Sequence, residues 1–481
     1  MGPEGGAAER GKACAGSVAE NTGAAGRAGT GSAAGAGMGQ VCGTRTTPVA
    51  RVGACAAVDG DLAAATDRAA GAAGGRADRA APEGESDNAR DADPAVWRLR
   101  GAPLIAATAT GPLAGATVAV KDLYALSGFT IGAGVQGFLR EQRPAVHHAA
   151  VVARLLAAGA EVAGIAHTDE FAYSLTGSNG RYGMPVNPAA PDRIPGGSTS
   201  GPAVAVARGE ADIGLGTDTA GSIRVPAAYQ GLWGIRTTHG RIDTTGLLPL
   251  AQSFDTVGWV TADGATLAAV AECLLGPDTA TPAGVVVDDR LCAAADPGIG
   301  SAVRQLAGTW DAEPVGIYPP DGWLSAFRVV QAYEAWANHG EWVAAHPGEL
   351  EPDVAQRFAF AATVTAGQAA AARAELAAAA DRIRTTLGDR VLLLPAAATP
   401  PPPRTAGPEL RESTRARTLR LTCLASIAGL PAVTLPLGRD EGGPSGVCLV
   451  GAPGTDRSLI SLALSTAAVP AEGSPHSEEP V

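Results

Sequence analysis

Aromatic side chains are scarce in this sequence, at 4% of 481 residues. Any hydrophobic core must therefore be built mainly from Ala, Val, Leu and Ile. Basic residues are outnumbered by acidic ones, and the formal net charge of -12 excludes nucleic acid as a main partner, because phosphate binding needs a basic surface. No uninterrupted apolar run approaches the roughly 18 residues of a membrane span, and the N-terminus lacks the apolar stretch of a secretory signal. We expect no membrane partner.

The cysteines of this sequence show no spacing typical of disulfide frameworks or metal sites. The seven cysteines are odd in number, scattered, and never spaced as Cys-x-x-Cys. This excludes a disulfide framework and a zinc site, and it favours a reducing cytoplasm. Because His, Cys and carboxylate residues nowhere show ligand spacing, the sequence predicts no metal and no cofactor.

Large apolar residues are almost missing from the first 92 positions. Leu62 is the only leucine there, the first aromatic residue is Trp97, and the first isoleucine is Ile105. Such a segment cannot bury enough apolar surface to offset roughly 1–2 kcal/mol per residue of backbone ordering entropy. We expect an extension without function, such as one added by a start codon assigned too far upstream, and a functional tail is the alternative. The predicted organisation is a disordered Gly/Ala-rich extension (1–92), one folded domain (93–469) and a disordered acidic tail (470–481).

Strands and helices alternate within the predicted domain. Residues 116–120 read as a buried strand, 146–159 as a helix stopped by Gly159, and 161–166 as a second strand. This order indicates an α/β layered fold with a largely parallel or mixed sheet. The remaining predictions are a helix with a capping-type start at TDEFAYSL (168–175), a strand at 211–218, a helix starting at Ser222, a helix at 366–387, a strand beginning near 391, a helix and strand within 420–438, and a strand within 445–453.

Two Gly-flanked serines stand close together in the chain, Ser198 in PGGSTSG and Ser222 in GTDTAGSIRVPA. Ser222 follows a strand through small residues at a predicted helix start, where backbone amides and the helix dipole can stabilise an oxyanion. It therefore suits a nucleophile. The structural alternative, an ordinary N-cap serine, stays open on these residues alone.

A serine nucleophile needs a base, and the seven histidines offer no visible partner. Lys121 ends the apolar strand VAVKD, where burial lowers a lysine pKa toward neutrality and makes a usable base. The alternative is a structural ion pair of Lys121 with Asp122 or with another carboxylate at a strand end. Ser198 is equally open to a plain turn.

These segments resemble the amidase signature family, a group of serine hydrolases acting on carboxamides. The family marks are a Lys-Asp after a strand, a Gly-Gly-Ser cluster and a G-T-D-x-G-G-S-x-R-x-P segment, and the two serines are 24 positions apart here, as in the family. The flanking segments GSNGRYGMPVNPAAPDR, QGLWGIRTTHGRI, LPLAQSFDTVGWV, GLPAVTLPLG and GVCLVG are similar too. The resemblance covers about residues 93–469. It implies a central mixed β-sheet covered by helices on both faces.

The resemblance also implies a role for each residue. Lys121 is the neutral base, Ser198 relays the proton next to a cis peptide bond, and Ser222 is the nucleophile. The sequence departs from the family at Thr199, Ala220 and Pro202, none of which is catalytic, and Ser200 is a rival for the role of Ser198. The implied oxyanion hole is the backbone of Thr219, Ala220, Gly221 and Ser222, and the residues that brace this loop are Asp218 and Arg224.

The expected activity is cleavage of the C–N bond of a small carboxamide to carboxylate and ammonia. The sequence around SFDTVGW is most similar to compact amidases that resemble indole-acetamide hydrolases. This similarity favours an aryl or alkyl amide as the substrate. The alternatives are an allophanate hydrolase, the A subunit of a tRNA-dependent amidotransferase, and a non-catalytic scaffold. The expected partner is a small-molecule amide, and a homodimer is left open.

Overall fold

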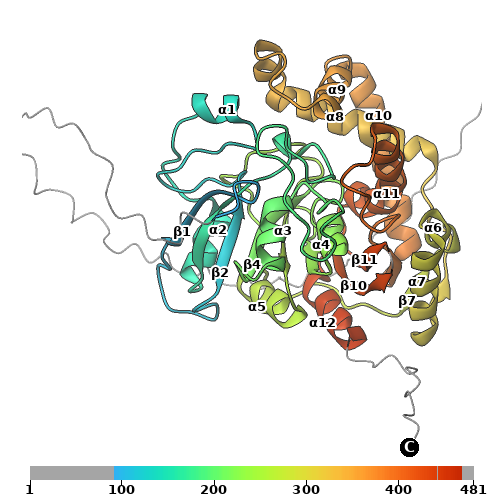
Figure 1. Ribbon diagram of the computed structural model, residues 1–481. Coiled ribbons are helices and arrows are strands. Elements are labelled where there is room, and N and C mark those ends of the chain that lie inside the picture. Colours follow the sequence, from blue (N-terminus) through green and yellow to red (C-terminus); the bar gives the residue numbers. More distant parts are fainter. Residues whose placement is uncertain (1–91, 441, 468–481) are drawn as a thin grey trace, which may run out of the picture. The chain divides into compact units, whose positions relative to one another are not determined.

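The computed structural model describes residues 92–440 and 442–467, and this part of the chain contains an 11-stranded sheet (Figure 1). The strands lie in the order β1-β3-β2-β4-β6-β5-β10-β11-β9-β7-β8. Their bounds are β1 Trp97–Ile105, β2 Thr117–Lys121, β3 Glu161–Ala166, β4 Ile213–Asp218, β5 Trp233–Arg236, β6 Thr256–Thr261, β7 Val285–Val287, β8 Glu313–Pro314, β9 Val391–Pro395, β10 Ala432–Asp440 and β11 Gly443–Val450.

The sheet is mixed. Strands β3, β2 and β4 run parallel to one another, as do β9, β7 and β8. Between these two groups, neighbours from β4 through β6, β5, β10 and β11 to β9 are antiparallel, and β1 adds an antiparallel edge to β3. The mixed α/β fold implied by the family resemblance is therefore confirmed.

Helices cover both faces of the sheet, and β9 shows why. Its side chains alternate between two hydrophobic clusters, with Val391 and Leu393 in one and Leu392 and Leu394 in the other. A strand buried on both faces reads as an unbroken apolar run, as VLLLP does. The helices are α1 Gln136–Glu141, α2 Ala150–Ala157, η2 Glu170–Ala172, α3 Ser200–Ala207, α4 Arg224–Gln230, α5 Gly264–Leu274, α6 Asp289–Ala294, α7 Pro297–Thr309, α8 Asp321–Ala345, α9 Pro352–Ala361, α10 Ala366–Leu387, α11 Pro408–Ala428 and α12 Asp456–Ala467.

The two faces carry different helices. Side chains of α2, α5, α7 and α12 belong to the cluster that contains Val391 and Leu393. Those of α8, α9, α10 and α11 belong to the opposite cluster. In Figure 1, α8, α9 and α10 lie at the top and α5 and α12 at the bottom, with the strands between them. The second group of helices is the one that borders the candidate site.

Several predicted elements match the structure closely. The strands predicted at 116–120, 161–166 and 211–218 are β2, β3 and β4. The helix predicted at 366–387 is α10, which starts with a reciprocal capping box between Thr365 and Gln368.

Three predicted helix starts are wrong. TDEFAYSL forms only the short 3-10 turn η2, because Phe171 and Ala172 adopt positive φ angles of 47° and 57°, which a helix cannot continue. The helix predicted from residue 146 begins at Ala150. Ser222 does not start a helix either, since α4 begins at Arg224 and Ser222 lies in the preceding turn.

The terminal predictions fall outside this description. Apart from Ala92, the predicted disordered extension (1–92) lies outside the described residues, and so does the predicted acidic tail (470–481). In the described ranges, no helix combines the length and the apolar character that crossing a bilayer requires.

Candidate active site

The predicted site residues meet at one edge of the sheet. Lys121 is the last residue of β2, and Ser222 follows β4, the parallel neighbour of β2, so both lie beyond carboxyl ends of adjacent strands. This edge is where α/β sheets usually place their ligand sites. The Ser198 loop joins them, because the amide of Thr199 donates to the carbonyl oxygen of Ser222 at 3.3 Å.

Lys121 is enclosed by hydroxyl groups. Its side chain is fully buried, and Nζ lies 2.8 Å from Ser198 Oγ, 3.1 Å from Thr199 Oγ1 and 2.9 Å from Thr217 Oγ1. Asp122 is not its ion-pair partner, because the Asp122 carboxylate faces Arg98 Nε at 3.1 Å. The ion pair with Asp122 is therefore wrong, and no other carboxylate forms an ion pair with Lys121 in the described part of the chain, where its partners are hydroxyl groups.

Burial is the main influence on the charge of Lys121. Desolvation lowers the pKa of its amine from 10.5 to about 7, although Asp169, Asp218 and Asp255 each raise it. The chain has 36 Lys and Arg residues, of which two are lysines, Lys12 and Lys121. A guanidinium could not lose its proton here, so a lysine at this position makes a neutral base available near pH 7.

Ser198, rather than Ser200, contacts the lysine. The peptide bond between Gly197 and Ser198 is cis, as the resemblance implied. Ser200 Oγ lies instead 3.3 Å from Asp169 Oδ1, and that carboxylate also accepts from the amide of Gly177 at 2.9 Å. The rival serine is thus occupied elsewhere.

Ser222 lies beside this pair but is not bonded to it. Its residue surface is 3% exposed, and among the described contacts its Oγ has no hydrogen-bond partner. It lines a small recess of about 10 Å³ together with Thr219 and Ala220. A recess of this size is about large enough for one water molecule.

The backbone N–H groups around Ser222 differ in whether they already donate a hydrogen bond within the protein. Gly221 has a φ of 124°, and its amide donates to Asp218 Oδ1 at 2.9 Å. This removes Gly221 from the predicted oxyanion hole, because a donor bonded to a buried carboxylate is not available to an oxyanion. The amides of Thr219, Ala220 and Ser222 have no such partner among the described contacts.

Asp218 holds this turn in place. Its carboxylate accepts from Arg224 Nη2 at 2.8 Å and lies 3.2 Å from Arg236 Nη1, and all three side chains are buried. Burial alone would raise the pKa of Asp218, but the two guanidinium groups hold it well below its usual range. The bracing position predicted for Asp218 and Arg224 agrees with these contacts.

The sequence reading missed two bracing residues. Arg236, at the end of β5, also donates to the carbonyl oxygen of Asp218, and the only signal was an arginine within the apolar segment GLWGIR. Thr422 on α11 donates to the carbonyl oxygen of Ala220 at 2.6 Å and accepts from Arg224 Nη1 through its own carbonyl. No local pattern marks Thr422, because it lies about 200 residues away in the chain.

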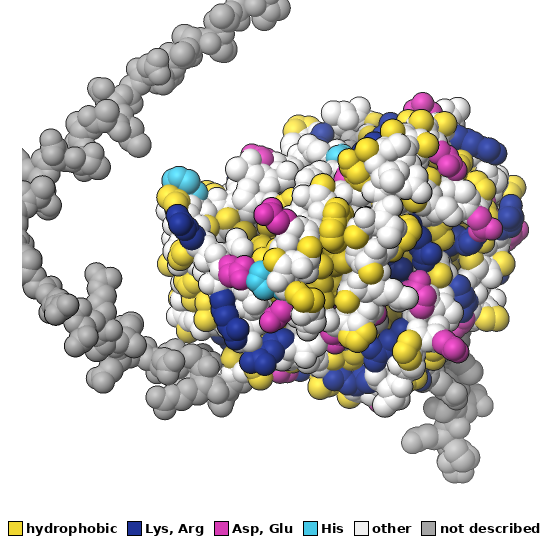
Figure 2. All heavy atoms as spheres, turned by 90° about the horizontal axis from the view of Figure 1, so that it is seen from above, with side chains coloured by type: hydrophobic (Ala, Val, Ile, Leu, Met, Phe, Trp, Pro, Cys, Tyr) yellow, Lys and Arg dark blue, Asp and Glu magenta, His cyan; other side chains and the backbone are white. Residues whose placement is uncertain are grey.

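A large cavity adjoins the recess. It has a volume of about 1200 Å³, slightly above the usual size of small-molecule sites. The two hollows share Tyr173, Ser174, Leu175, Gln331 and Arg415, so the cavity leads toward Ser222. Figure 2 looks onto the face that carries α8–α10 and shows apolar side chains gathered across its middle with basic side chains beside them.

The fold and the site define an α/β protein with a buried Lys–Ser contact and a second serine beneath a ligand-sized cavity. A family model described as Amidase matches residues 76–302. "Amidase 1" of Arabidopsis thaliana is 36% identical over 396 residues, which is 74% of this chain and 93% of that protein. The chain belongs to the amidase family, and it is a hydrolase of amide C–N bonds.

Solved structures agree with this assignment. One titled "Crystal structure of amidase" superposes with a TM-score of 0.67 at 31% identity, covering 74% of this chain and 84% of that one. Another, from a study of the origins of an s-triazine catabolic enzyme, reaches a TM-score of 0.69 at 30% identity, covering 75% of this chain and 85% of the other.

Proposed function

We propose that this chain hydrolyses a small carboxamide through an acyl-enzyme on Ser222, with Ser198 and Lys121 as the proton relay. The observation that carries the proposal is the 2.8 Å contact between Lys121 Nζ and Ser198 Oγ in a buried site next to Ser222. A buried amine with a pKa of about 7 is suited to accept a proton at neutral pH.

The reaction has two halves. Ser222 Oγ attacks the amide carbonyl carbon while its proton passes to Ser198 Oγ, and the Ser198 proton passes to Lys121. The relay then returns a proton to the amide nitrogen, the C–N bond breaks, and ammonia leaves. Water attacks the acyl-enzyme by the same route and releases the carboxylic acid, which restores Ser222.

The negative charge that develops on the carbonyl oxygen needs donors. We assign this role to the amides of Thr219, Ala220 and Ser222, which have no partner among the described contacts. The Asp218 carboxylate, held by Arg224 and Arg236, supports the turn that carries them. Donors set in place before the reaction stabilise a developing oxyanion without reorganising.

The relay has one open link, since Ser222 Oγ is not hydrogen-bonded to Ser198 Oγ among the described contacts. Catalytic hydrogen bonds are often long without substrate and tighten when it binds. A bound carbonyl would draw Ser222 Oγ toward the carbon under attack and leave its proton facing the relay.

Labelling with a fluorophosphonate probe tests the nucleophile. We expect the wild type to be labelled on Ser222 and Ser222→Ala to remain unlabelled. Ammonia release from a panel of amides, with allophanate and glutamine included, tests the substrate and separates simple amides from the other two enzymatic readings. An unlabelled wild type that releases no ammonia would favour the non-catalytic scaffold.

We also propose a cytoplasmic location. The four described cysteines, Cys273, Cys292, Cys423 and Cys448, are all free thiols, which suits a reducing compartment. Microscopy of a fluorescent fusion tests the location, and light scattering on the purified protein decides whether two copies pair.

A further inference from the structure

Arg415 lies where the large cavity meets the recess at Ser222. It lines both hollows, and it is the only charged residue among those that line the recess. The other walls of the recess are mostly apolar, with Ala172, Leu175, Leu250 and Leu419 among them. A charge beside apolar walls interacts more strongly with a ligand than it would in water.

The charge of Arg415 is only weakly compensated. Its Nη1 lies 3.4 Å from Glu412 Oε1, and the same oxygen also accepts from Arg328 Nη2 at 3.2 Å. Glu412 is 55% exposed, whereas the Arg415 side chain is 14% exposed. The Nε of Arg415 is buried and has no hydrogen-bond partner in the described part of the chain.

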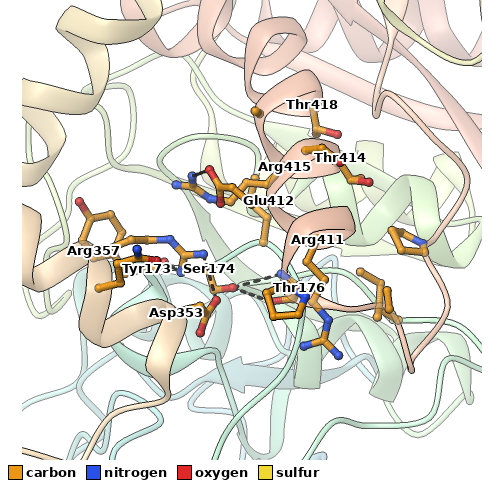
Figure 3. Close-up of a pocket in the computed structure, with 18 of the residues that line it drawn as sticks. Tyr173, Ser174, Thr176, Asp353, Arg357, Arg411, Glu412, Thr414, Arg415 and Thr418 are labelled. Atoms are coloured by element: carbon orange, nitrogen blue, oxygen red, sulfur yellow. Dashed lines mark hydrogen bonds and ion pairs between the residues drawn. The ribbon is translucent and has the colours of Figure 1, made fainter. Parts of the chain in front are cut away.

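The side chains around Arg415 do not neutralise its positive charge. Arg357 faces Arg415 across the cavity, but its own charge is matched by Asp353 at 2.9 Å. Figure 3 shows Arg357 and Asp353 on α9 at one side, with Glu412 and Arg415 on α11 opposite. Over the whole cavity, four arginines (Arg328, Arg357, Arg411 and Arg415) are balanced in number by Glu351, Asp353, Glu409 and Glu412. The local excess of positive charge therefore lies at Arg415, whose one ion-pair partner in the described part of the chain, Glu412, is shared with Arg328.

A guanidinium with free donors in an apolar recess is costly unless a ligand completes its hydrogen bonds. A carboxylate is the group that a planar guanidinium fork matches best. A neutral amide would leave the Arg415 donors unsatisfied once it displaced water from the recess.

We propose that the substrate is a carboxamide whose acyl part carries a carboxylate, and that Arg415 binds this carboxylate while the scissile carbonyl lies over Ser222. The inference rests on the proposed function, because it takes Ser222 as the attacking group. It makes Arg415 a determinant of substrate choice between anionic and neutral amides.

The test compares matched substrates. Malonamate, succinamate, glutaramate and adipamate are each paired with the neutral amide of equal chain length that ends in a methyl group. Ammonia release provides kcat/KM for both members of each pair. We expect the wild type to favour the anionic member of at least one pair by about 10- to 100-fold, the range typical of a hydrogen bond to a charged group.

Arg415→Met should bring this ratio close to one, whereas Glu412→Gln should raise it, because Arg415 then loses its competing carboxylate. Two variants with effects of opposite sign cannot both be explained by misfolding. The matched control is Arg417→Met on the same helix, where Arg417 pairs with Asp296 at 2.8 Å and lies outside both hollows. The Arg417→Met ratio should equal that of the wild type.

A second readout does not need turnover. The four carboxylated amides should slow fluorophosphonate labelling of the wild type more than their neutral partners do, and Arg415→Met should abolish the difference. The inference would be overturned if the wild type had equal kcat/KM for the anionic and neutral amides and if both protected Ser222 equally from labelling. In that case, labelling of Ser222 would still support the proposed function. A ratio that survives Arg415→Met would also overturn it. Absence of any labelling would instead overturn the proposed function.

Discussion

Two charged regions of the molecule differ in how their side chains are paired. The first is the sheet edge that holds Asp218, Arg224 and Arg236, and the second is the wall of the large cavity that holds Asp353 and Glu412. At the edge, Asp218, Arg224 and Arg236 are 0–1% exposed, and the carboxylate contacts both guanidinium groups. Among the polar side-chain atoms of these three residues, only Arg236 Nε lacks a hydrogen-bond partner in the described part of the chain. On the wall, Asp353 is 44% and Glu412 55% exposed, and the Glu412 carboxylate is shared by two arginines, Arg328 and Arg415. A buried network with many hydrogen bonds cannot rearrange cheaply, whereas partly exposed pairs can exchange partners for water or ligand.

Under the proposed function and the further inference, the edge performs the chemistry and the wall selects the substrate. The edge has groups with strongly perturbed protonation, such as Lys121, in a geometry held from several elements. The wall is formed by α8, α9 and α11, which carry no such group near Ser222 except Arg415.

The largest effect is expected from Ser222→Ala. It removes the only atom that can bond to the acyl group, so ammonia release should fall to background, a loss on the order of 10⁶ as for other serine nucleophiles. Loss of probe labelling should accompany it, with the unfolding midpoint kept within experimental error as the control. Residual turnover above background would assign the nucleophile elsewhere.

Loss of the relay should cost less. Ser198→Ala or Lys121→Ala leaves the nucleophile in place, so turnover should fall by 10²–10⁴, the range of general acid–base assistance, while slow labelling persists. The double variant should be scarcely worse than either single one, because residues that act as one unit are not additive. Lys121→Arg should not restore the rate. Independent, multiplying losses would contradict the relay.

A stability measurement probes the bracing network. Asp218→Asn leaves two buried guanidinium groups without their carboxylate, and breaking such a buried pair typically costs 3–5 kcal/mol. Urea unfolding followed by tryptophan fluorescence measures this change. A loss below about 1 kcal/mol would mean that the network braces much less than its burial indicates.

The pH profile tests the base directly. The neutral amine is the active form, so the logarithm of kcat/KM should rise by one per pH unit up to the Lys121 pKa of about 7 and then level off. Through the same group, the free energy of unfolding should increase as the pH rises from about 7 to 10.5, because in this range the unfolded lysine binds a proton that the folded one has lost.

Asp255→Asn is the control for this assignment. Asp255 is one of three carboxylates that raise the Lys121 pKa, and it also accepts from Thr219 Oγ1 at 2.6 Å. Removing its charge should move the midpoint to lower pH. A midpoint that moves upward or stays in place would point to another titrating group, such as Asp169, whose pKa burial raises to about 6.

The smallest effect is expected on the cavity wall. Asp353→Asn breaks a partly exposed ion pair with Arg357, and such pairs are worth about 0–1 kcal/mol. Urea unfolding next to Asp218→Asn provides the comparison. A cost equal to that of Asp218→Asn would erase the division between a rigid edge and an adaptable wall.

Much of the fold was readable from local patterns. The strands β2, β3 and β4 and the helix α10 follow from short apolar runs and a strong capping box. The failures occur at helix starts. Phe171 and Ala172 adopt positive φ angles that only tertiary packing imposes, and Ser222 precedes α4 by two residues.

The residues of the candidate site could be predicted from the sequence only in part. Lys121, Ser198 and Ser222 stand in recognisable motifs, and the structure brings their loops together. The sequence could not separate a free amide from one bonded to Asp218, as at Gly221, because that depends on how the turn folds. It also could not reveal Thr422 or Arg415, which reach the site from α11.

By itself, the sequence determined the alternation of strands and helices and the chemical groups available for catalysis, because both depend on neighbouring residues. Tertiary structure alone decided that Lys121 is surrounded by three hydroxyl groups rather than paired with Asp122. It alone decided that Arg415 borders the recess at Ser222. Burial and distance set a pKa or an ion pair, and both arise only when segments far apart in the chain pack together.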